Sequence, residues 1–413
     1  MSPLLGDELP AFLESLSQPP VRGLRLNPAK VGAAELARLL DVELTPVPWA
    51  EHGFVLPPDA PSLGWHPAID CGLFYLQDPA SMLAPAVLDP APGWRVADVA
   101  AAPGGKTTDL AARVGPGGLV LANEVVRARL RLLESALDRW GSGAVVTCSA
   151  ALERLTGSWD GVLLDAPCTG EALVRRDAKA TREWSEASVL GNARRQARLL
   201  DAVASLVRPG GVLVYSTCSF EIAENEDQVA GFLDRHDGWK LDTEQRVWPH
   251  RDAGDGQFVA RLLRTGADAI REAPRWTEQR LGKEAAAAWR RFRAETAPGY
   301  EVDEDALVVV GDSLYLAPGE NLPFASLSRP GLPLGRNRPG RFEPAPAFAT
   351  AIDAAHASAT VEVTPEYLRG ETAPDPGPDG WVLVTYERWG LGWARRSRGV
   401  LKNFFPKAQR RGG

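Results

Sequence analysis

The chain has 413 residues, 45% of them hydrophobic and 24% charged, with a formal net charge of -7. This length predicts two or three domains, and the composition is typical of a soluble globular protein. Because no stretch approaches the roughly 18 consecutive apolar residues of a membrane span, we expect no membrane partner. The acidic balance excludes nucleic-acid binding by bulk charge, so any such surface has to be local.

The N-terminus and the cysteines bear on location and metal content. A signal peptide would carry basic residues where this chain has Asp7, Glu8 and Glu14, so we expect a cytoplasmic protein. The cysteines form no CxxC pair and the histidines no HxxxH pair, which argues against zinc sites and disulfides. We therefore expect no bound metal. The four cysteines are Cys71, Cys148, Cys168 and Cys218.

Three regions follow one another along the chain. Residues 1–70 combine helical patches with many prolines, which predicts a small N-terminal domain. Residues 71–265 carry an α/β pattern, with strands predicted at 96–99, 119–122, 162–164 and 212–215 and helices at 127–140 and 192–207. The second helix should stop at Pro209-Gly210-Gly211. In the C-terminal region, 266–413, we expect a charged helical stretch to about residue 293, linker or loop-rich structure at 321–348, and a strand at 381–386.

A glycine pair follows the first predicted strand, in the loop Ala100-Ala101-Ala102-Pro103-Gly104-Gly105-Lys106. Glycines between a strand and a helix let the backbone approach a nucleotide-like ligand closely. The motif is neither GxGxxG nor a P-loop, and such a pair is often only a turn. Glu124 ends the second strand 19 residues beyond Gly105, where an acid can bind a ribose hydroxyl. The alternative for Glu124 is a solvated strand-end acid or a helix cap.

Two further loops each carry a thiol. Asp165-Ala166-Pro167-Cys168 follows the third strand, and Ser216-Thr217-Cys218 follows the fourth. Since ligands bind beyond the carboxyl ends of parallel strands, all four loops should face one crevice. The acid-rich stretch 221–227 predicts the first turn of a helix whose dipole would favour a thiolate at Cys218. Cys71 and Cys148 are interpreted as inert thiols.

The strings AAAPGGKT, LLDAPCTG and STCS, in this order and spacing, resemble the Nol/Nop/Sun family of RNA cytosine-5 methyltransferases. Gln77-Asp78-Pro79-Ala80-Ser81 and Asp255-Gly256-Gln257-Phe258 are also similar to family motifs, so the resemblance covers roughly residues 20–265. It implies a Rossmann-like class I sheet with a reversed last strand that uses S-adenosylmethionine, after a small RNA-contacting domain. It further implies that Cys218 is the nucleophile on carbon 6 of cytosine and that Cys168 helps to release the enzyme. Asp165 would hold the cytosine edge or the cofactor.

The tail Gly392-Trp393-Ala394 and Leu401-Lys402-Asn403 resembles the C-terminal PUA-like RNA-binding domain of family members that modify small-subunit ribosomal RNA. The resemblance therefore implies 16S ribosomal RNA as substrate, free or in the 30S subunit, with transfer RNA as the alternative. Residues 381–413 hold eight Lys or Arg against one acid, interleaved with tryptophan and phenylalanine, which favours RNA contact over a solvated tail.

Basic residues outside the tail are further candidates for RNA contact. Arg22, Arg25 and Asn27 match the basic signature of the family's N-terminal domain. Arg175, Arg176, Lys179 and Arg182 follow the Cys168 loop and either grip the RNA backbone or form an ordinary solvated helix face.

The chain departs from the family pattern at one position, and three alternative functions can be weighed against the one that the resemblance implies. Many relatives carry an Asp after the third strand to bind adenine, whereas this chain offers Thr147, Ser149 and Ala150, so the backbone or Ser149 would have to serve. A DNA cytosine-5 methyltransferase would carry its nucleophilic cysteine in a Pro-Cys-Gln loop and would also have a Glu-Asn-Val motif. In this chain Pro167-Cys168 is followed by Thr-Gly, and neither motif is present. A nicotinamide oxidoreductase would leave the cysteines without a task. A non-catalytic RNA-binding assembly factor would not need paired thiols.

Overall fold

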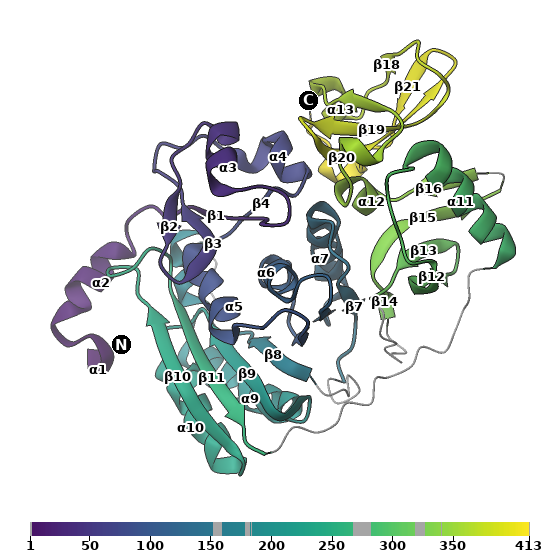
Figure 1. Cartoon of the computed structure of the whole chain (residues 1–413). Helices are drawn as coiled ribbons and strands as arrows, with labels where there is room; N and C mark the ends of the chain where they lie inside the picture. Colours follow the sequence, from purple (N-terminus) through teal and green to yellow (C-terminus); the bar gives the residue numbers. More distant parts are fainter. Residues whose placement is uncertain are drawn as a thin grey trace.

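The structure is a computed structural model that describes residues 2–151, 159–177, 182, 184–266, 282–318, 327–339 and 341–412. The described strands form four sheets: one in the N-terminal part, an eight-stranded sheet in the centre, and two in the C-terminal part. Figure 1 shows the N-terminal and C-terminal parts on opposite sides of the helices that cover the central sheet. Among the described residues, no helix has the length and apolar composition needed to cross a membrane.

The N-terminal part is an antiparallel sheet in the order β2-β3-β1-β4. Leu24 and Phe54 of this sheet are buried together with apolar residues of α3 and α4. The first two helices pack elsewhere, because Phe12 meets Phe220 of the central part edge to face, with ring centroids 5.0 Å apart. The elements are α1 Ser2–Leu5, α2 Leu9–Ser15, β1 Gly23–Leu26, α3 Ala33–Leu40, β2 Thr45–Val47, β3 Ala50–Val55, α4 Pro67–Asp70 and β4 Phe74–Leu76.

The central sheet has the strand order β10-β11-β9-β8-β5-β6-β7-β14. Strands β7, β6, β5, β8 and β9 are parallel, whereas β11 runs antiparallel between β9 and β10. This is the Rossmann-like sheet with a reversed last strand that the resemblance implies. The elements are α5 Leu83–Leu88, β5 Arg95–Asp98, α6 Gly105–Val114, β6 Leu119–Asn123, α7 Arg127–Trp140, β7 Val145–Thr147, β8 Trp159–Asp165, α9 Glu186–Ala204, β9 Val207–Thr217, α10 Glu226–Arg235, β10 Trp239–Val247 and β11 Gln257–Arg264.

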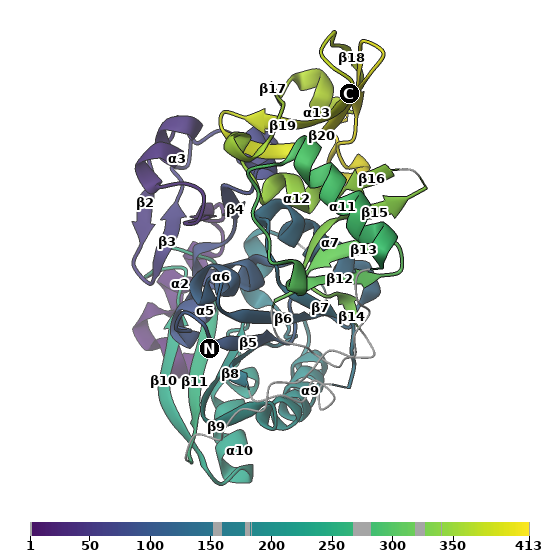
Figure 2. The same cartoon turned by 45° about the vertical axis from the view of Figure 1, so that its right-hand side comes forward.

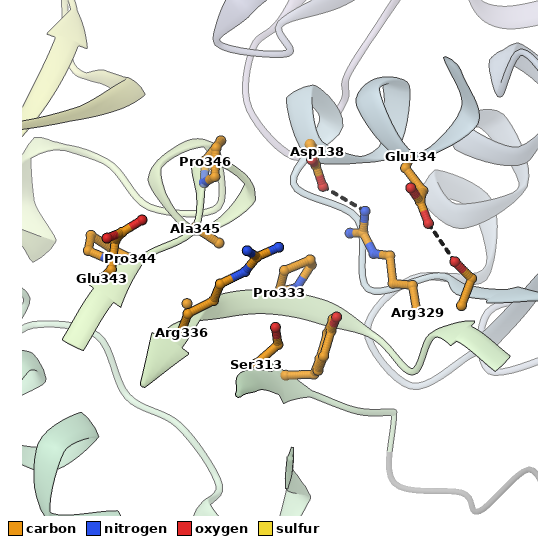
Figure 3. A pocket seen from close by; sticks show the side chains of 13 residues that line it. Glu134, Asp138, Ser313, Arg329, Pro333, Arg336, Glu343, Pro344, Ala345 and Pro346 are labelled. Atoms are coloured by element: carbon orange, nitrogen blue, oxygen red, sulfur yellow. Dashed lines mark hydrogen bonds and ion pairs between the residues drawn. The ribbon is translucent and has the colours of Figure 1, made fainter. Parts of the chain in front are cut away.

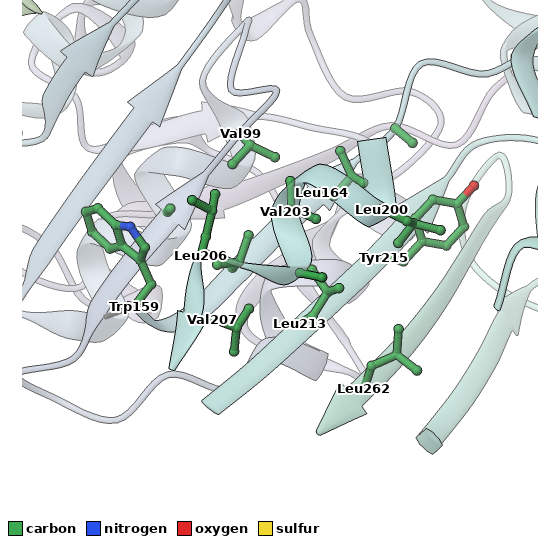
Figure 4. Packing of buried hydrophobic residues seen from close by; sticks show 14 of the residues in the cluster. Val99, Trp159, Leu164, Leu200, Val203, Leu206, Val207, Leu213, Tyr215 and Leu262 are labelled. Carbon is green, nitrogen blue, oxygen red and sulfur yellow. The ribbon is translucent and has the colours of Figure 1, made fainter. Parts of the chain in front are cut away.

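Alternate residues of the central strands pack on opposite faces of the sheet. Val96 of β5 and Val120 of β6 pack with residues of α5, α6 and α7, while Ala97 and Leu121 pack with residues of α9 and α10. Figure 4 shows part of the second layer, in which Leu200 of α9 lies among the strand residues. Because both faces are covered, these strands are apolar throughout, which is why the sequence reveals them.

The predicted end of the long helix before β9 was wrong. Helix α9 begins at Glu186, where Ser185 forms a capping box with Ser188, and it ends at Ala204. Pro209, Gly210 and Gly211, predicted to stop the helix, lie inside β9 instead. The pairing of β9 with β8 shifts register between Trp159 and Gly161, next to this Pro-Gly-Gly stretch, and becomes regular from Gly161 onward.

The C-terminal part contains two small sheets, in the orders β12-β13-β15-β16 and β17-β19-β20-β21-β18. Trp289 and Phe292 of α11 pack with Phe342, Phe348 and Trp393 in a core that joins the two sheets. Of the charged helical stretch expected up to residue 293, residues 267–281 lie outside the described residues. The elements are α11 Lys283–Thr296, β12 Leu307–Val310, β13 Ser313–Leu316, β14 Leu327–Arg329, β15 Leu332–Arg338, β16 Arg341–Pro344, α12 Pro346–Thr350, β17 Thr360–Glu362, α13 Pro365–Arg369, β18 Ala373–Pro374, β19 Gly380–Tyr386, β20 Trp389–Ser397 and β21 Val400–Asn403.

The described part of segment 321–348 is not the linker that its composition predicts, because it forms β14, β15, β16 and the start of α12. Strand β14 extends the central sheet by pairing with β7. The buried Arg329 fixes this strand to α7 by an ion pair with Asp138 (Nη1–Oδ1, 2.7 Å) and a hydrogen bond to the Ser142 carbonyl, beside a pocket shown in Figure 3. Arg329 also donates to the Gly331 carbonyl at 2.8 Å, so this buried cation has three acceptors, which offset the loop-forming tendency of the neighbouring prolines and glycines.

The N-terminal part and the last C-terminal sheet lie next to each other, as Figure 2 shows. Residues of both parts share one apolar core, in which Leu36 and Phe74 lie in the same cluster as Trp389 and Phe405. Arg388 forms a bidentate ion pair with Glu35, at 2.8 and 3.0 Å. The two ends of the chain are therefore held against each other and against the central part.

Arg25 joins the N-terminal sheet to the central part. Its guanidinium is 1% exposed and donates to the Gly105 carbonyl (3.0 Å) and to the Thr108 hydroxyl (2.6 Å) at the start of α6. It also lies 3.7 Å from the carboxylate of the buried Asp109 and over the ring of Trp140. Burial lowers the pKa of Arg25, and the charge of Asp109 opposes that shift.

Arg25→Leu should therefore lower the free energy of unfolding by about 3 kcal/mol, because it removes the cation beside the buried Asp109 carboxylate and the donor to the Thr108 hydroxyl oxygen. Urea denaturation followed by tryptophan fluorescence measures the change. Arg38→Leu on α3 is the matched control, since Arg38 is exposed and should tolerate the change within about 0.5 kcal/mol. Equal stability of the two variants would contradict a docking role for Arg25.

Candidate active site

Loops from four parallel strands meet at one edge of the central sheet. Strand β5 lies between β6 and β8, and the helices that follow β5 and β8 pack on opposite faces of the sheet. A ligand-binding crevice is expected at such a switch point of a parallel sheet. The loops are tied together by backbone hydrogen bonds, from Ala101 N to Asn123 O (2.9 Å) and from Ala166 N to Ser216 O (2.8 Å). The residues predicted to share a crevice are thus on adjoining loops.

The glycine loop leads from β5 directly into α6. Gly104 has φ +112°, a conformation that side chains disfavour, and an added Cβ would lie 2.9 Å from the Cβ of Ala136 on α7. Gly105 is the first residue of α6, and no side chain of the N-cap residue, Gly104, caps the first backbone N–H groups of this helix. Ala101 and Ala102 are buried, Ala100 is half-buried, and Pro103 is exposed.

Two buried carboxylates at strand ends each keep an oxygen without a hydrogen-bond donor. Glu124 is 2% exposed; its Oε1 accepts from Val126 N (2.8 Å), and its Oε2 has only the Arg129 guanidinium nearby, at 3.4 Å. Asp98 accepts from the Thr107 hydroxyl through Oδ2 (2.7 Å), while Oδ1 is unpartnered. Burial raises the pKa of Asp98 to about 6. Such acceptors suit the donors of a bound ligand.

Asp165 is the centre of a polar cluster at the crevice. Its Oδ2 receives the Lys106 ammonium at 2.7 Å, and its Oδ1 accepts from the Ser216 hydroxyl at 2.7 Å and from the Gln257 amide at 3.4 Å. Burial opposes the charged form of Lys106, but the charge and hydrogen bond of Asp165 prevail and raise the pKa of Lys106. The Asp165 side chain remains 30% exposed, so it keeps room to accept from a ligand.

The two cysteines of the loops after β8 and β9 are in contact. The sulfurs of Cys168 and Cys218 lie 3.4 Å apart, and both thiols are free and half-buried. The hydrogen bond with Cys218 and then burial hold the pKa of Cys168 well above its usual range, and the charges of Glu224 and Asp165 add to the shift. Cys168 is therefore a protonated thiol at neutral pH, available to donate to its neighbour.

The helix predicted over 221–227 differs in the structure. A short 3-10 turn at Ile222–Glu224 comes first, and α10 begins only at Glu226. Asn225 has φ -123° and ψ -97°, which interrupts the helical path between them. The N-terminus of α10 is thus eight residues beyond Cys218, and the predicted helix-dipole effect on that thiol finds no support in this geometry.

Three of the predicted RNA contacts are buried and cannot reach RNA in this conformation. Arg25 lies beneath the glycine loop as described, and Asn27, 2% exposed, donates to the carbonyls of Gly72 (3.1 Å) and Trp140 (3.4 Å). The Arg175 side chain is 3% exposed and pairs with Asp255. Their basic or polar groups form hydrogen bonds and ion pairs that hold parts of the chain together.

The other basic candidates differ in exposure. Arg22 is half-buried and donates to the Ala60 (2.6 Å) and Pro61 (2.7 Å) carbonyls. Arg176 is 33% exposed and pairs with Asp255 and Asp78. Arg182 is exposed, and Lys179 lies outside the described residues.

The aromatic rings of the basic tail are largely buried. Trp389 is 6% exposed, Trp393 2% and Phe405 1%, each within an apolar cluster, and Trp381 and Phe404 are half-buried. The stacking of bases on this run of rings, inferred from their alternation with arginines, is therefore wrong for the buried ones. Arginines lie over two of these rings, Arg388 over Trp389 and Arg395 over Trp381, so the interleaved cations contact rings of their own domain.

Some residues of the site escaped sequence reasoning. Asn123, just before Glu124, organises the loop after β7: its Oδ1 accepts from Ser149 N and from the Thr147 hydroxyl, both at 2.9 Å. Ser149 is consequently buried, while Ala150 is exposed. Asp98 was detectable as an acid at the end of an apolar strand, but Arg129 and Glu224 carry no signal in an isolated string. Among the described residues, no group of three His, Cys, Asp or Glu side chains is placed to share a metal ion.

The raised pKa of Asp98 predicts a pH effect on stability. Between the ordinary value of 3.8 and about 6, the native carboxyl keeps a proton that the unfolded chain has lost, so native stability falls as pH rises through this window. Above pH 6 the contribution of Asp98 has fallen by about 3 kcal/mol. Asp98→Asn should remove this term, so its stability relative to wild type should increase from pH 4 to pH 7 in urea denaturation. A constant difference across that range would contradict the assignment.

Comparison with known proteins bears on the family. The model of 16S rRNA methyltransferase RsmB/F matches residues 85–263, and models of the RsmF N-terminal domain, first C-terminal domain and PUA domain match residues 1–79, 291–352 and 360–411. The chain is 34% identical to ribosomal RNA small subunit methyltransferase F of Klebsiella pneumoniae (strain 342), over 97% of this chain and 93% of that protein. It is 33% identical to the protein of the same name from Escherichia coli (strain K12), again over 97% and 93%.

Solved structures agree in fold. A methyltransferase homolog protein from Pyrococcus horikoshii is 32% identical with a TM-score of 0.56, covering 63% of this chain and 91% of that one. NSun6 from the same organism, solved with SFG, is 23% identical with a TM-score of 0.59, covering 64% and 97%. The Rossmann-like methyltransferase fold is confirmed, with N-terminal and PUA domains on either side. The chain belongs to the ribosomal RNA small subunit methyltransferase F (RsmF) family.

Proposed function

We propose that this protein methylates carbon 5 of cytosine in small-subunit (16S) ribosomal RNA, with S-adenosylmethionine as methyl donor and Cys218 as a transient covalent nucleophile. The observation that carries the proposal is the pair of thiols, 3.4 Å apart, on the loops after β8 and β9. A binding protein has no use for two free thiols beside a half-buried Lys-Asp pair, whereas chemistry on a pyrimidine ring does.

Carbon 5 of cytosine does not attack an electrophile unaided. Addition of the Cys218 thiolate to carbon 6 breaks the carbon 5–carbon 6 double bond and turns the ring into an enamine, whose electron pair is available at carbon 5. In this proposal Asp165, held by Lys106 and Ser216, accepts a hydrogen bond from the amino group of the ring. Because the ring must be attacked on its face, the target cytosine has to be unstacked from the RNA.

Release of the product reverses the addition. The proton at carbon 5 leaves to solvent, and the electron pair of that C–H bond re-forms the carbon 5–carbon 6 double bond. The Sγ–carbon 6 bond breaks, and its electron pair returns to Cys218 as a thiolate. Cys168 stays protonated, so its S–H can donate to the departing thiolate and stabilise it. The two cysteines therefore have different tasks: Cys218 forms and breaks the bond to carbon 6, and Cys168 donates to the departing thiolate.

The crevice fits S-adenosylmethionine in its donor and acceptor groups. Glu124 Oε2 and Asp98 Oδ1 are buried acceptors without a hydrogen-bond donor, suited to a ribose hydroxyl and to an ammonium group. The loop Ala100–Lys106 offers close backbone approach, and the backbone around Ser149 is the remaining candidate for the adenine. When bound there, the cofactor supplies an electrophilic methyl group.

The substrate and the division of labour are inferred from the family. The relatives are named as methyltransferases of small-subunit ribosomal RNA, and the PUA model matches residues 360–411. We therefore propose ribosomal RNA, free or in the 30S subunit, as the substrate of the catalytic region 71–265, contacted by regions 1–70 and 266–413. Arg22, Arg176 and Arg182 remain the proposed basic contacts outside the C-terminal region.

Cys218→Ala should abolish methylation, and Cys168→Ala should accumulate a covalent protein–RNA adduct, because the first lacks the nucleophile and the second lacks the group that aids its departure. Transfer of tritium from labelled S-adenosylmethionine to 16S RNA, free and in 30S subunits, measures the first effect, which should exceed about 10³-fold. Denaturing gels show the adduct.

Cys71→Ala serves as the matched control, because Cys71 is buried against Trp389 away from the crevice. Wild-type activity in Cys218→Ala would overturn the nucleophile assignment. Labelling of transfer RNA alone would change the substrate, and labelling of no RNA at all would favour an assembly factor.

Glu124→Gln should weaken S-adenosylmethionine binding about tenfold or more, because a charge-assisted hydrogen bond to a ribose hydroxyl contributes about 1.5–3 kcal/mol. Isothermal titration calorimetry on the free protein measures the dissociation constant without RNA. Glu134→Gln is the control: Glu134 is on α7, bonds Ser328 in the pocket beside β14, and should leave the constant unchanged. Unaltered affinity in Glu124→Gln would refute the ribose contact.

A further inference from the structure

The short distance between the two sulfurs needs a cause outside the sheet. The described pairing of β8 with β9 ends at Asp165 and Ser216. Two more backbone hydrogen bonds join the loops, from Ala166 N to Ser216 O (2.8 Å) and from Ala172 N to Cys218 O (3.1 Å). The second bond holds the backbone of Cys218, but neither bond involves the stretch from Pro167 to Thr169 that carries Cys168. The contacts that fix this stretch come from side chains.

Glu224 brackets Cys168 on both sides. Its carboxylate, 0% exposed, accepts from the backbone N–H of Thr169 (3.2 Å), from the Thr169 hydroxyl, and from the Gln196 amide (3.2 Å). The same Gln196 nitrogen donates to the Pro167 carbonyl at 3.0 Å. The residues before and after Cys168 are thus both fixed through one buried carboxylate.

Asn225 does the same for Cys218. It is also 0% exposed; its Oδ1 accepts from the Thr217 hydroxyl at 2.5 Å, and its Nδ2 donates to the Ser219 carbonyl at 2.9 Å. A cross-link between the loops completes the arrangement, because the hydroxyls of Thr169 and Ser219 lie 3.3 Å apart. Neighbours in the sequence therefore hold the two loops, one loop each.

We propose that Glu224 and Asn225 form a clasp, meaning this pair of adjacent buried residues, that positions Cys168 and Cys218 against each other. Neither residue has a hydrogen bond to a sulfur, so both are positioning residues rather than catalytic ones. The break between the 3-10 turn and α10 at Asn225 lets two consecutive side chains reach two loops. The catalytic consequence of the clasp rests on the proposed function, whereas the thiol geometry does not.

The chemistry of Glu224 supports this role. A buried carboxylate is costly, and no ion pair is found for Glu224 among the described residues, so its three donors compensate for the lost hydration. An apolar residue would fill the space without that cost but could not bracket Cys168. The Cys218 hydrogen bond and burial are the larger causes of the raised pKa of Cys168, and the charge of Glu224 adds to them.

The test measures the effective concentration of the two thiols toward each other in the full chain, in a Cys71→Ala/Cys148→Ser background. In glutathione buffers, two protein thiols and one oxidised glutathione exchange to one protein disulfide and two reduced glutathiones, so electrons and protons balance. Mass spectrometry gives the oxidised fraction at each buffer ratio. Neither RNA nor cofactor is needed, so the result is independent of the methylation chemistry.

Glu224→Gln and Asn225→Ala should each lower the effective concentration about tenfold or more, because the loops lose their common anchor. Glu226→Gln is the matched control, since Glu226 is the next acid along and pairs with Arg246 (2.7 Å) without contact to either loop. Thr169→Val should reproduce the loss, and Thr169→Ser, which keeps the hydroxyl, should not. If Glu224→Gln does not fold, the comparison of Thr169→Val with Thr169→Ser still tests the proposal.

Methylation kinetics then separate positioning from binding. Glu224→Gln should lower kcat at least tenfold with KM for RNA within twofold of wild type, because the thiols, not the RNA surface, are displaced. An effective thiol concentration unchanged in both Glu224→Gln and Thr169→Val would overturn the clasp, whatever the enzyme does. If wild type methylated no cytosine, the proposed function would fail while the thiol measurement still decided the clasp.

Discussion

The parallel pairing of β5, β6, β8 and β9 is the constraint on which the rest of the structure depends. Parallel strands end at the same edge, so every loop that carries a functional residue leaves the sheet there. Parallel pairing also demands crossovers that cover both faces, and α5 to α7 on one side and α9 and α10 on the other supply them. The position of the crevice and the apolar character of the strands are thus consequences of the same geometry.

That geometry buries carboxylates, which is unfavourable unless they are paired. Glu124, Asp98 and Glu224 are buried at strand ends or beneath the loops, whereas the Asp165 side chain is 30% exposed. Asp165 pairs with a lysine and Glu224 has three hydrogen-bond donors. Glu124 Oε2 has an ion pair with Arg129 but no hydrogen bond, and Asp98 Oδ1 has no hydrogen-bond donor. Of these four carboxylates, the two with an oxygen that accepts no hydrogen bond, Glu124 and Asp98, lie on the side where the glycine loop is. A ligand is expected on that side from the strand order.

The sequence predicted the central strands and the grouping of Cys168, Cys218, Asp165 and the glycine loop, because both follow from local patterns and from the rule on strand ends. It failed where the partner of a residue is distant. Arg25 and Arg175 have the composition of an RNA surface, yet their partners, the start of α6 and Asp255, make them internal. Segment 321–348 failed for the same reason, since Arg329 finds Asp138 nearly 200 positions earlier. The sequence gives the chemical type of each side chain, but its partners depend on the fold when they are distant along the chain.

Under the proposed function, the two ends of the chain would limit how RNA approaches Cys218. The N-terminal sheet and the C-terminal sheet share a core across α7, and Arg388 and Glu35 join them at the surface. Modules fixed to one another lose little conformational freedom when they bind, so contacts made far from the crevice contribute to affinity without an ordering cost. Under the proposed function, a base has to leave its stack to reach Cys218, and that requires a few kcal/mol from binding elsewhere. Parts of the chain that share a core would supply this energy best to RNA whose shape matches their spacing, so the proposed selection of the target cytosine and its unstacking would draw on the same contacts.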